Sequence, residues 1–215
     1  EFSMRMEEDF KGVDLTKIYP TIRPEWFRAG QDFKESYLHD KAAPGMETLF
    51  VESRSGFNVF LTKEYVKPAL VYMNEEEIKR QAYDNLRGKG WTAEEYSFPS
   101  PLDSDAEFHV YSRTNFPFQN QFFMPDMARG RMPSSYLLAI PTRDLAVALT
   151  MEIPPKTAFT ARRAAVETGF WQYVQLIFLR EPRPISGDVY WMHGGRSYRL
   201  RVLPPAESAE LRMRA

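Results

Sequence analysis

Two neighbouring apolar runs give the clearest structural signal in the chain. Tyr136–Ile140 and Leu145–Leu149 each have the length of a buried strand, and the tetrad Pro141–Asp144 between them is rich in turn-forming residues. The pattern predicts a buried β-hairpin that carries Arg143 and Asp144 at its turn. A charged pair at the end of a buried hairpin is a position where a ligand can be bound.

Similar short runs of apolar or alternating residues recur along the rest of the chain. They predict further strands at 47–53, 57–62, 69–73, 91–98, 108–113, 188–192 and 196–203. Gly56 can take the positive φ of a tight hairpin between the first two of these runs. In the last run Tyr198 and Leu200 alternate with arginines, which predicts one buried and one basic face.

Helical periodicity is confined to two segments. At 74–87, Asn74 and Glu77 have the spacing of a capping box, and three consecutive glutamates lie near the positive end of the helix. At 158–180 a wide apolar stripe follows the candidate caps Thr157 and Thr160, and Gly169 marks a bend or a close approach. Prolines at 20 and 24 make 14–28 an extended segment without regular structure, and 32–45 is expected to be a polar loop.

These elements predict an α+β fold, with antiparallel hairpins that form one or two mixed sheets packed against two main helices, 74–87 and 158–180. The length suits a single domain at 7–205, and a division into sub-domains 7–98 and 106–205 is the alternative. We expect residues 1–6 to be a cloning remnant at a disordered start, and 206–215 to be a charged tail.

Composition argues against several classes of protein. Lys and Arg number 28 and Asp and Glu number 29, and this balance argues against a nucleic-acid-binding surface. The chain has no cysteine, which rules out disulfides, thiolate nucleophiles and cysteine-based metal sites. The same lack of cysteine suits a reducing, cytoplasmic location. The chain also lacks an apolar run of about 18 residues, so no membrane-spanning helix is expected.

Catalytic and metal-binding motifs are not recognisable in the sequence. The three histidines, His39, His109 and His193, have no metal-ligand spacing, and ordinary strand or surface positions are the simpler interpretation. No G-x-S-x-G motif marks a nucleophilic serine. We therefore expect no catalytic residue, no metal and no cofactor.

Two groups of residues are candidates for binding. Tyr19, Arg23, Arg143 and Asp144 could line a pocket that recognises an anion, although a salt bridge at a hairpin end is the simpler interpretation of Arg143 and Asp144. The second group lies in a segment rich in phenylalanine and glutamine, and belongs either to the core or to a protein-binding surface. It comprises Phe116, Phe118 and Phe122.

Three short motifs resemble a known family. Ile18–Arg23, Asn74–Arg87 and Ala139–Asp144 occur in an order similar to that of the YtpQ-like family of uncharacterised bacterial proteins, and the resemblance spans about residues 14–180. It implies a cytoplasmic bacterial protein of α+β fold, with no activity established for the family.

The absence of a catalytic motif and the aromatic segment together favour a non-catalytic cytoplasmic bacterial binding protein that acts through contact with another protein. An immunity- or antitoxin-type partner is one concrete version. The alternative is an enzyme or small-ligand binder with an anion-recognising pocket near Arg23 and Arg143/Asp144. The sequence does not indicate an oligomeric state.

Overall fold

The computed structural model describes residues 12–31, 36–55, 57–113, 116–180 and 184–200. These residues form two compact units. Unit 1 contains the described residues up to 93 together with 116–128 and Arg113, and unit 2 contains 94–112 and the described residues from 129 onward. The sequence-based boundary between 98 and 106 falls inside unit 2, in the loop between two paired strands.

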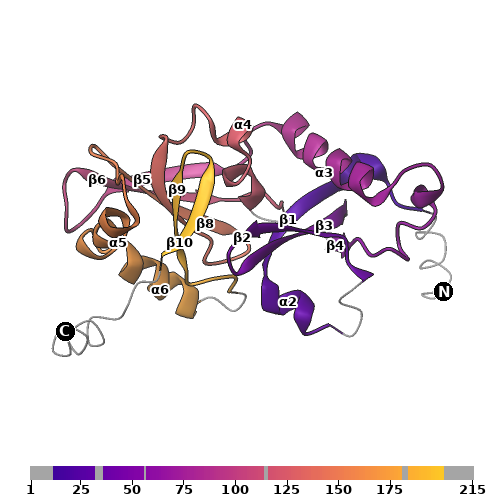
Figure 1. The fold of residues 1–215 in the computed structure, drawn as a ribbon, viewed down its shortest axis with the longest axis horizontal. Coiled ribbons are helices and arrows are strands. Elements are labelled where there is room, and N and C mark those ends of the chain that lie inside the picture. The colour runs from indigo at the N-terminus through magenta and orange to yellow at the C-terminus, as the bar shows by residue number, and fades with distance from the viewer. Residues whose placement is uncertain (1–11, 32–35, 56, 114–115, 181–183, 201–215) are drawn as a thin grey trace. The chain divides into compact units, whose positions relative to one another are not determined.

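The predicted α+β class is confirmed, with helices and two sheets in the described residues (Figure 1). The expectation of mixed sheets is wrong, because the pairings between named strands are antiparallel. Short turns join five of the eight pairs, and a turn of that kind imposes antiparallel pairing, whereas parallel neighbours need long crossovers.

The sheet of unit 1 is built around β3 (Met46–Arg54). This strand pairs with β1 (Ile18–Pro24) along nearly its whole length, and with β2 (His39–Ala43) and β4 (Phe57–Phe60) along its two halves. The predicted hairpin at 47–62 is confirmed, although Gly56 lies outside the described residues.

Helix α3 (Glu75–Lys89) confirms the helix predicted at 74–87. The Asn74 side chain accepts from the Glu77 backbone at 3.0 Å, and the Glu77 carboxylate accepts from the Asn74 backbone at 2.8 Å. Ile78 and Ala82 bury the apolar side of the helix in a core that includes Phe50 of β3. Gly90 ends the helix with φ of 68°, as expected for a helix C-terminus.

The expected irregular segment at 14–28 is wrong, because it contains strand β1 and the short helix α2 (Glu25–Ala29), preceded by the 3₁₀ helix η1 (Leu15–Lys17). Proline lacks a backbone N–H and is tolerated on an edge strand, whose outer side forms no ladder. Strand β1 is such an edge, since among the described strands it pairs only with β3. The expected polar loop at 32–45 is likewise corrected, because it contains strand β2.

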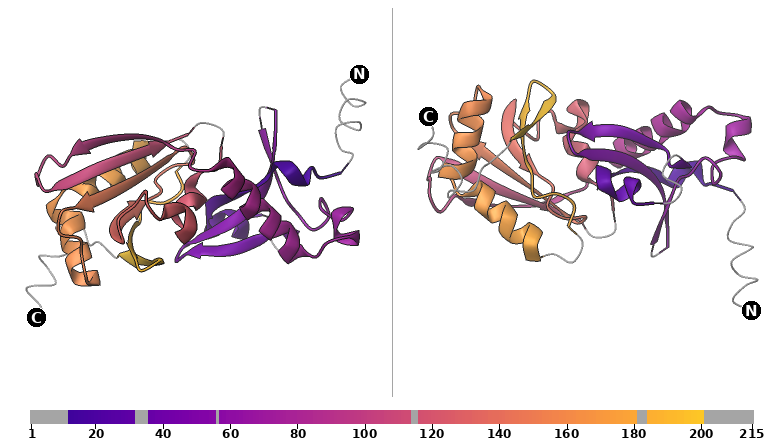
Figure 2. Two further views of the ribbon diagram at one scale, coloured as in Figure 1. Left: turned by 90° about the horizontal axis from the view of Figure 1, so that it is seen from above. Right: turned by 60° about the horizontal axis from the view of Figure 1, so that its bottom comes forward.

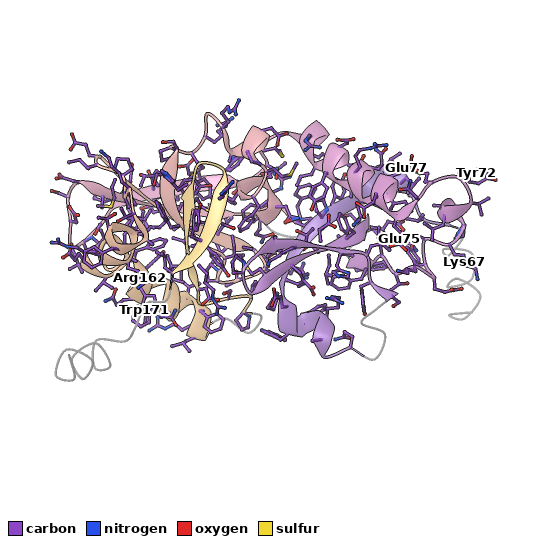
Figure 3. All side chains as sticks on the ribbon, in the orientation of Figure 1. Lys67, Tyr72, Glu75, Glu77, Arg162 and Trp171 are labelled. Atoms are coloured by element: carbon purple, nitrogen blue, oxygen red, sulfur yellow. The ribbon has the colours of Figure 1, made fainter. Side chains whose placement is uncertain are left out.

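The expected strand at 69–73 is also wrong. The segment forms the 3₁₀ helix η3 (Ala69–Val71), and Pro68 at its start has helical φ and ψ. Val71 and Tyr72 are exposed, so this short apolar run is not buried against a sheet as a strand would be. Figure 3 shows Tyr72 on the loop that leads into α3.

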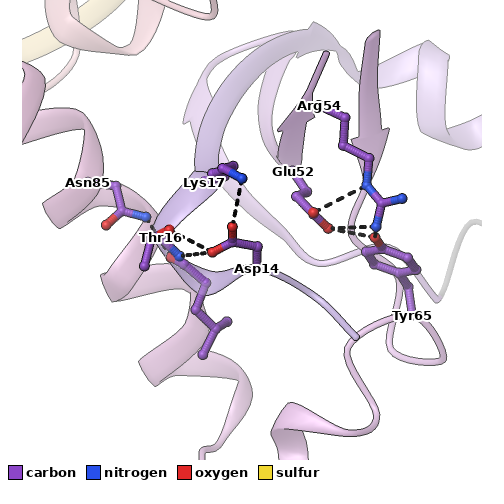
Figure 4. Close-up of polar contacts among 8 residues, drawn as sticks. Asp14, Thr16, Lys17, Glu52, Arg54, Tyr65 and Asn85 are labelled. Atoms are coloured by element: carbon purple, nitrogen blue, oxygen red, sulfur yellow. Dashed lines mark hydrogen bonds and ion pairs between the residues drawn. The ribbon is translucent and has the colours of Figure 1, made fainter. Parts of the chain in front are cut away.

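A buried charged group joins β3 to the loop after β4 (Figure 4). The Glu52 carboxylate accepts from Tyr65 Oη at 2.5 Å and from Arg54 Nε at 3.2 Å. Burial, together with the hydrogen bond to Glu52, raises the pKa of Tyr65 to about 12. Tyr65 therefore stays a hydrogen-bond donor near neutral pH, and it partners a carboxylate that would be costly to bury alone.

Unit 2 contains one six-stranded sheet in the order β10-β9-β7-β8-β6-β5. The predicted hairpins at 136–149 and 188–203 are confirmed, although residues 201–203 lie outside the described part of the chain. The strands are β5 (Glu94–Pro99), β6 (Ala106–Ser112), β7 (Ser135–Ala139), β8 (Leu145–Met151), β9 (Val189–His193) and β10 (Arg196–Leu200).

The alternation expected in the last strand holds only at Leu200, which is buried. Tyr198 packs on Trp191 with a ring-centroid distance of 5.2 Å, but it keeps 40% of its surface exposed. The correction follows from the position of β10, because it is an edge strand of the sheet that the described residues form.

Helices α5 (Ala158–Glu167) and α6 (Phe170–Arg180) pack on one face of this sheet (Figure 2). The expected single helix at 158–180 is therefore divided in two. Gly169 separates the halves with φ of +75°, a left-handed conformation that ends a helix and favours glycine. The predicted cap is confirmed, since Thr157 and Thr160 form a capping box.

Candidate functional site

The side chains of β6 divide between the two faces of the sheet in unit 2. Ala106 and Phe108 point into the core that α5 and α6 cover. Because side chains alternate along a strand, Glu107, His109 and Tyr111 lie on the opposite face. Strand β6 therefore places a carboxylate, an imidazole and a phenol in a row on one surface.

The register with the neighbouring strands adds two further polar side chains to this row. Thr150 of β8 lies directly opposite Glu107, and Glu95 of β5 lies directly opposite Tyr111. His109 is thus diagonal to both and bridges them. Its Nδ1 lies 2.8 Å from Glu95 Oε1, and its Nε2 lies 2.8 Å from Thr150 Oγ1.

The partners of His109 fix the direction of these hydrogen bonds. An ionised carboxylate only accepts hydrogen bonds, so Nδ1 carries the proton that is shared with Glu95. In the neutral ring Nε2 is then the acceptor, and the Thr150 hydroxyl donates to it. The order carboxylate, imidazole, hydroxyl is the arrangement in which a histidine can take the hydroxyl proton.

Tyr111 contacts both Glu95 and His109. Its hydroxyl donates to Glu95 Oε1 at 3.2 Å, and its ring stacks on the His109 ring with 14° between the planes. Burial, reinforced by the negative charge of Glu95, raises the pKa of Tyr111 above its ordinary value. The phenol therefore keeps its proton, and the same Glu95 oxygen is bound from two directions.

A groove opens at the Thr150 end of the row. It has a volume of ≈ 460 Å³, within the range of small-molecule sites. Glu107 and Thr150 belong both to the groove and to the polar row. The lining residues are Pro99, Ser104, Asp105, Ala106, Glu107, Thr150, Met151 and Glu152.

Tyr111 is buried, but two other members of the row are accessible, since the His109 side chain keeps 14% of its surface exposed and the Glu95 side chain 44%. A ligand in the groove would contact Thr150, whose hydroxyl is hydrogen-bonded to His109. Across the described ranges, no cluster of three or more histidine, aspartate or glutamate side chains could hold a metal ion.

The expected anion pocket draws on both units. In unit 1 the Arg23 guanidinium donates to Thr21 Oγ1 at 3.0 Å and to the Ile22 carbonyl at 2.6 Å, and it lies 5.4 Å from the Phe60 ring centre. Tyr19 is buried, with its ring edge-to-face with Phe116 at 5.1 Å. Arg23 is thus held within its own strand and by aromatic neighbours.

Arg143 and Asp144 belong to unit 2, at the turn between β7 and β8. They form the ion pair that the simpler interpretation predicts, with 3.7 Å between Arg143 Nε and Asp144 Oδ1. A pocket made of Tyr19, Arg23, Arg143 and Asp144 would need residues from both units, and it stays a prediction.

Of the two alternatives left open for the aromatic segment, Phe118 and Phe122 belong to the core, since they are 0% and 2% exposed and so are not available to a protein partner. Phe122 packs edge-to-face on Trp91 at 5.1 Å. The 3₁₀ helix η4 (Gln119–Phe122) turns these rings inward, and Gln121 Nε2 anchors it by donating to the Gly90 carbonyl at 2.7 Å. Phe116 is half-buried against Tyr19, so this aromatic segment is mainly core.

No sequence motif marks Glu95 or Thr150, and the spacing of the histidines gives no reason to select His109. The alternation of Glu107, His109 and Tyr111 could have shown that these residues share a face. The partners of His109 lie 14 and 41 residues away, and only the pairing of β5, β6 and β8 brings them together.

No protein-family model, curated protein or solved structure matches the chain. The resemblance to the YtpQ-like family therefore stays a prediction. Within the described residues, no helix combines the length and the apolar character needed to cross a membrane.

Proposed function

We propose that the protein is a hydrolase that forms a covalent acyl intermediate on Thr150. The observation that supports this proposal is the position of His109, whose two ring nitrogens lie 2.8 Å from Glu95 and from Thr150 beside an open groove. All three side chains project from paired strands, which hold catalytic groups more rigidly than loops do.

The first half of the reaction forms the intermediate. Thr150 Oγ1 attacks the carbonyl carbon of an ester or amide, and its proton passes to His109 Nε2. The carbonyl oxygen takes up the negative charge, while Glu95 stabilises the imidazolium. When the carbonyl re-forms, the bond to the leaving group breaks and that group takes the proton from Nε2.

The second half regenerates the enzyme. Water attacks the acyl carbon and gives a proton to His109 Nε2. The bond between that carbon and Thr150 Oγ1 then breaks, and Oγ1 recovers the proton as the carboxylic acid leaves. The net reaction adds one water molecule across one ester or amide bond and leaves Glu95, His109 and Thr150 unchanged.

A fluorophosphonate probe tests the nucleophile directly. Thr150 Oγ1 should attack phosphorus, fluoride should leave, and the hydroxyl proton should pass to His109, so the intact mass rises by one phosphonyl group. We expect peptide mass spectrometry to find the adduct on Thr150. We also expect the adduct to be lost in Thr150→Ala and retained in Thr150→Ser, which keeps a hydroxyl.

Ser97→Ala is the matched control. Ser97 is a hydroxyl opposite His109 in the register, but no hydrogen bond joins these two described side chains. Its removal should leave labelling at the wild-type level. Absence of the adduct from wild-type protein, or an adduct on a different residue, would contradict the proposal.

Non-catalytic protein binding is the second candidate, and the helical layer of unit 2 favours it. Four large apolar side chains on α5 and α6 are exposed, among them Leu176 at 53% and Leu179 at 76%; the other two are Phe159 and Val166. Large exposed apolar side chains can form the contact with a partner protein. Arg162 of α5 and Trp171 of α6 lie on the same two helices (Figure 3).

An immunity- or antitoxin-type role, expected from the sequence, would use such a surface. The double substitution Leu176→Asp and Leu179→Asp should abolish capture of a specific protein from lysate of the source organism, because it places charges in an apolar contact. Circular dichroism should show that the fold is kept. Capture of the same proteins by both forms would exclude α6 as the contact surface.

A further inference from the structure

Glu107 is the cross-strand neighbour of the proposed nucleophile and lines the same groove. It lies directly opposite Thr150 in the antiparallel pair of β6 and β8. Side chains at such positions are neighbours on the same face, with Cβ atoms about 5 Å apart. Its Oε2 is 3.7 Å from His109 Nε2, and half of its side-chain surface is exposed. A substrate group next to the reacting carbonyl would therefore meet Glu107.

The rest of the groove has the same sign of charge. Asp105 and Glu152 lie beside each other at the end of the sheet, where the Glu152 backbone donates to the Asp105 carbonyl at 3.1 Å. The lining residues include these two carboxylates and Glu107, with no lysine or arginine among them. The whole chain is nearly neutral, so this end of unit 2 concentrates negative charge.

The negative charge of the groove favours substrates that carry a positive charge. A positively charged group beside the acyl carbon would be attracted by Glu107 and then by the two carboxylates beyond it, while a carboxylate would be repelled. All three carboxylates are exposed, and an exposed charge pair contributes only modestly, so the three together amount to about a tenfold preference over an uncharged group.

We infer that the substrate carries an ammonium or guanidinium group next to the acyl carbon that Thr150 attacks, and that Glu107 selects for this group. The inference rests on the proposed function, because it assigns a substrate class to the same site. Basic peptides and small amino-acid derivatives share this chemistry.

Three fluorophosphonate probes of equal length, whose tails end in ammonium, methyl or carboxylate, test the inference. The rate at which each labels Thr150, followed by intact-mass spectrometry at low ionic strength, should fall in that order. We expect about a tenfold ratio between the ammonium and methyl probes. The ratio should shrink in high salt, because exposed charges are screened.

The substitution Glu107→Gln should lower the ammonium-to-methyl ratio measurably, since it keeps the shape of the side chain and removes one of the three charges that line the groove. Glu94→Gln is the control, because Glu94 is an exposed carboxylate of β5 that does not line the groove. It should leave the ratio unchanged.

Two adverse results are distinguishable. Equal labelling by all three probes on Thr150 would overturn the charge preference and leave the proposed hydrolase intact. Failure of every probe to label Thr150 would overturn both.

Discussion

Replacing His109 with glutamine is expected to slow the labelling of Thr150 by a fluorophosphonate at least about a hundredfold, the usual contribution of a positioned general base. Glutamine is polar and similar in reach, so it can still hydrogen-bond to Glu95 or Thr150. It cannot take up the hydroxyl proton as the Oγ1–phosphorus bond forms, which is the role that the 2.8 Å contact to Nε2 assigns to the imidazole.

The substitution Glu95→Gln tests whether Glu95 is needed to fix which ring nitrogen of His109 carries the proton, or only to hydrogen-bond to the ring. An amide can donate to Nδ1, and a ring that accepts there carries its proton on Nε2 instead. Nε2 would then donate to Thr150 and could not act as a base, so labelling should fall in this variant as well.

The labelling rates of both variants would be measured by intact-mass spectrometry, with Ser97→Ala as the unaffected control. A wild-type rate in His109→Gln would mean that Thr150 reacts without a base.

Truncating Phe170 to alanine is expected to lower the free energy of unfolding of unit 2 by about 3–5 kcal/mol, as for other large-to-small core changes. The ring is fully buried at the start of α6 and packs edge-to-face on Phe108 of β6 at 5.5 Å. Its removal leaves a cavity between the helical layer and the sheet, and the surrounding strands limit how far the cavity can close.

Leu179→Ala provides the matched control for Phe170→Ala, since it removes an apolar side chain of the same helix that is 76% exposed. It should change the free energy of unfolding by less than about 0.5 kcal/mol. Urea titration followed by circular dichroism measures the stability of both variants. Hydrogen exchange should then show lost protection in β6 and β8. If Phe170→Ala lowered the free energy of unfolding by less than about 1 kcal/mol, the neighbouring side chains would have filled the cavity.

The elements that could be predicted from the sequence are those with local determinants. Helix α3 is predictable because Asn74 and Glu77 form their capping contacts within one turn of the chain. The β7–β8 hairpin is predictable for a similar reason, since its two apolar runs are separated only by a turn. In both cases the signal and the contact lie within a few residues of each other.

The failures follow from contacts that no local pattern specifies. The two prolines of β1 suggest that the segment is not a strand, because proline is excluded from central strands. Proline is tolerated on edge strands, and only the order of the sheet shows that β1 is an edge. The same limit applies to the candidate site. Alternation within β6 is visible in the sequence, but the register that brings Thr150 within reach of His109 is a long-range property.

The path of the chain through the two units limits how the protein can be divided. The backbone passes from unit 1 to unit 2 after residue 93, returns after 112 and passes again after 128. A fragment that begins at Arg129 would retain Thr150 but would lack β5 and β6, and with them Glu95 and His109. A single proteolytic cut or recombination point therefore cannot separate unit 1 from unit 2. A fragment or chimaera can carry the proposed activity only if it contains both chain segments of unit 2.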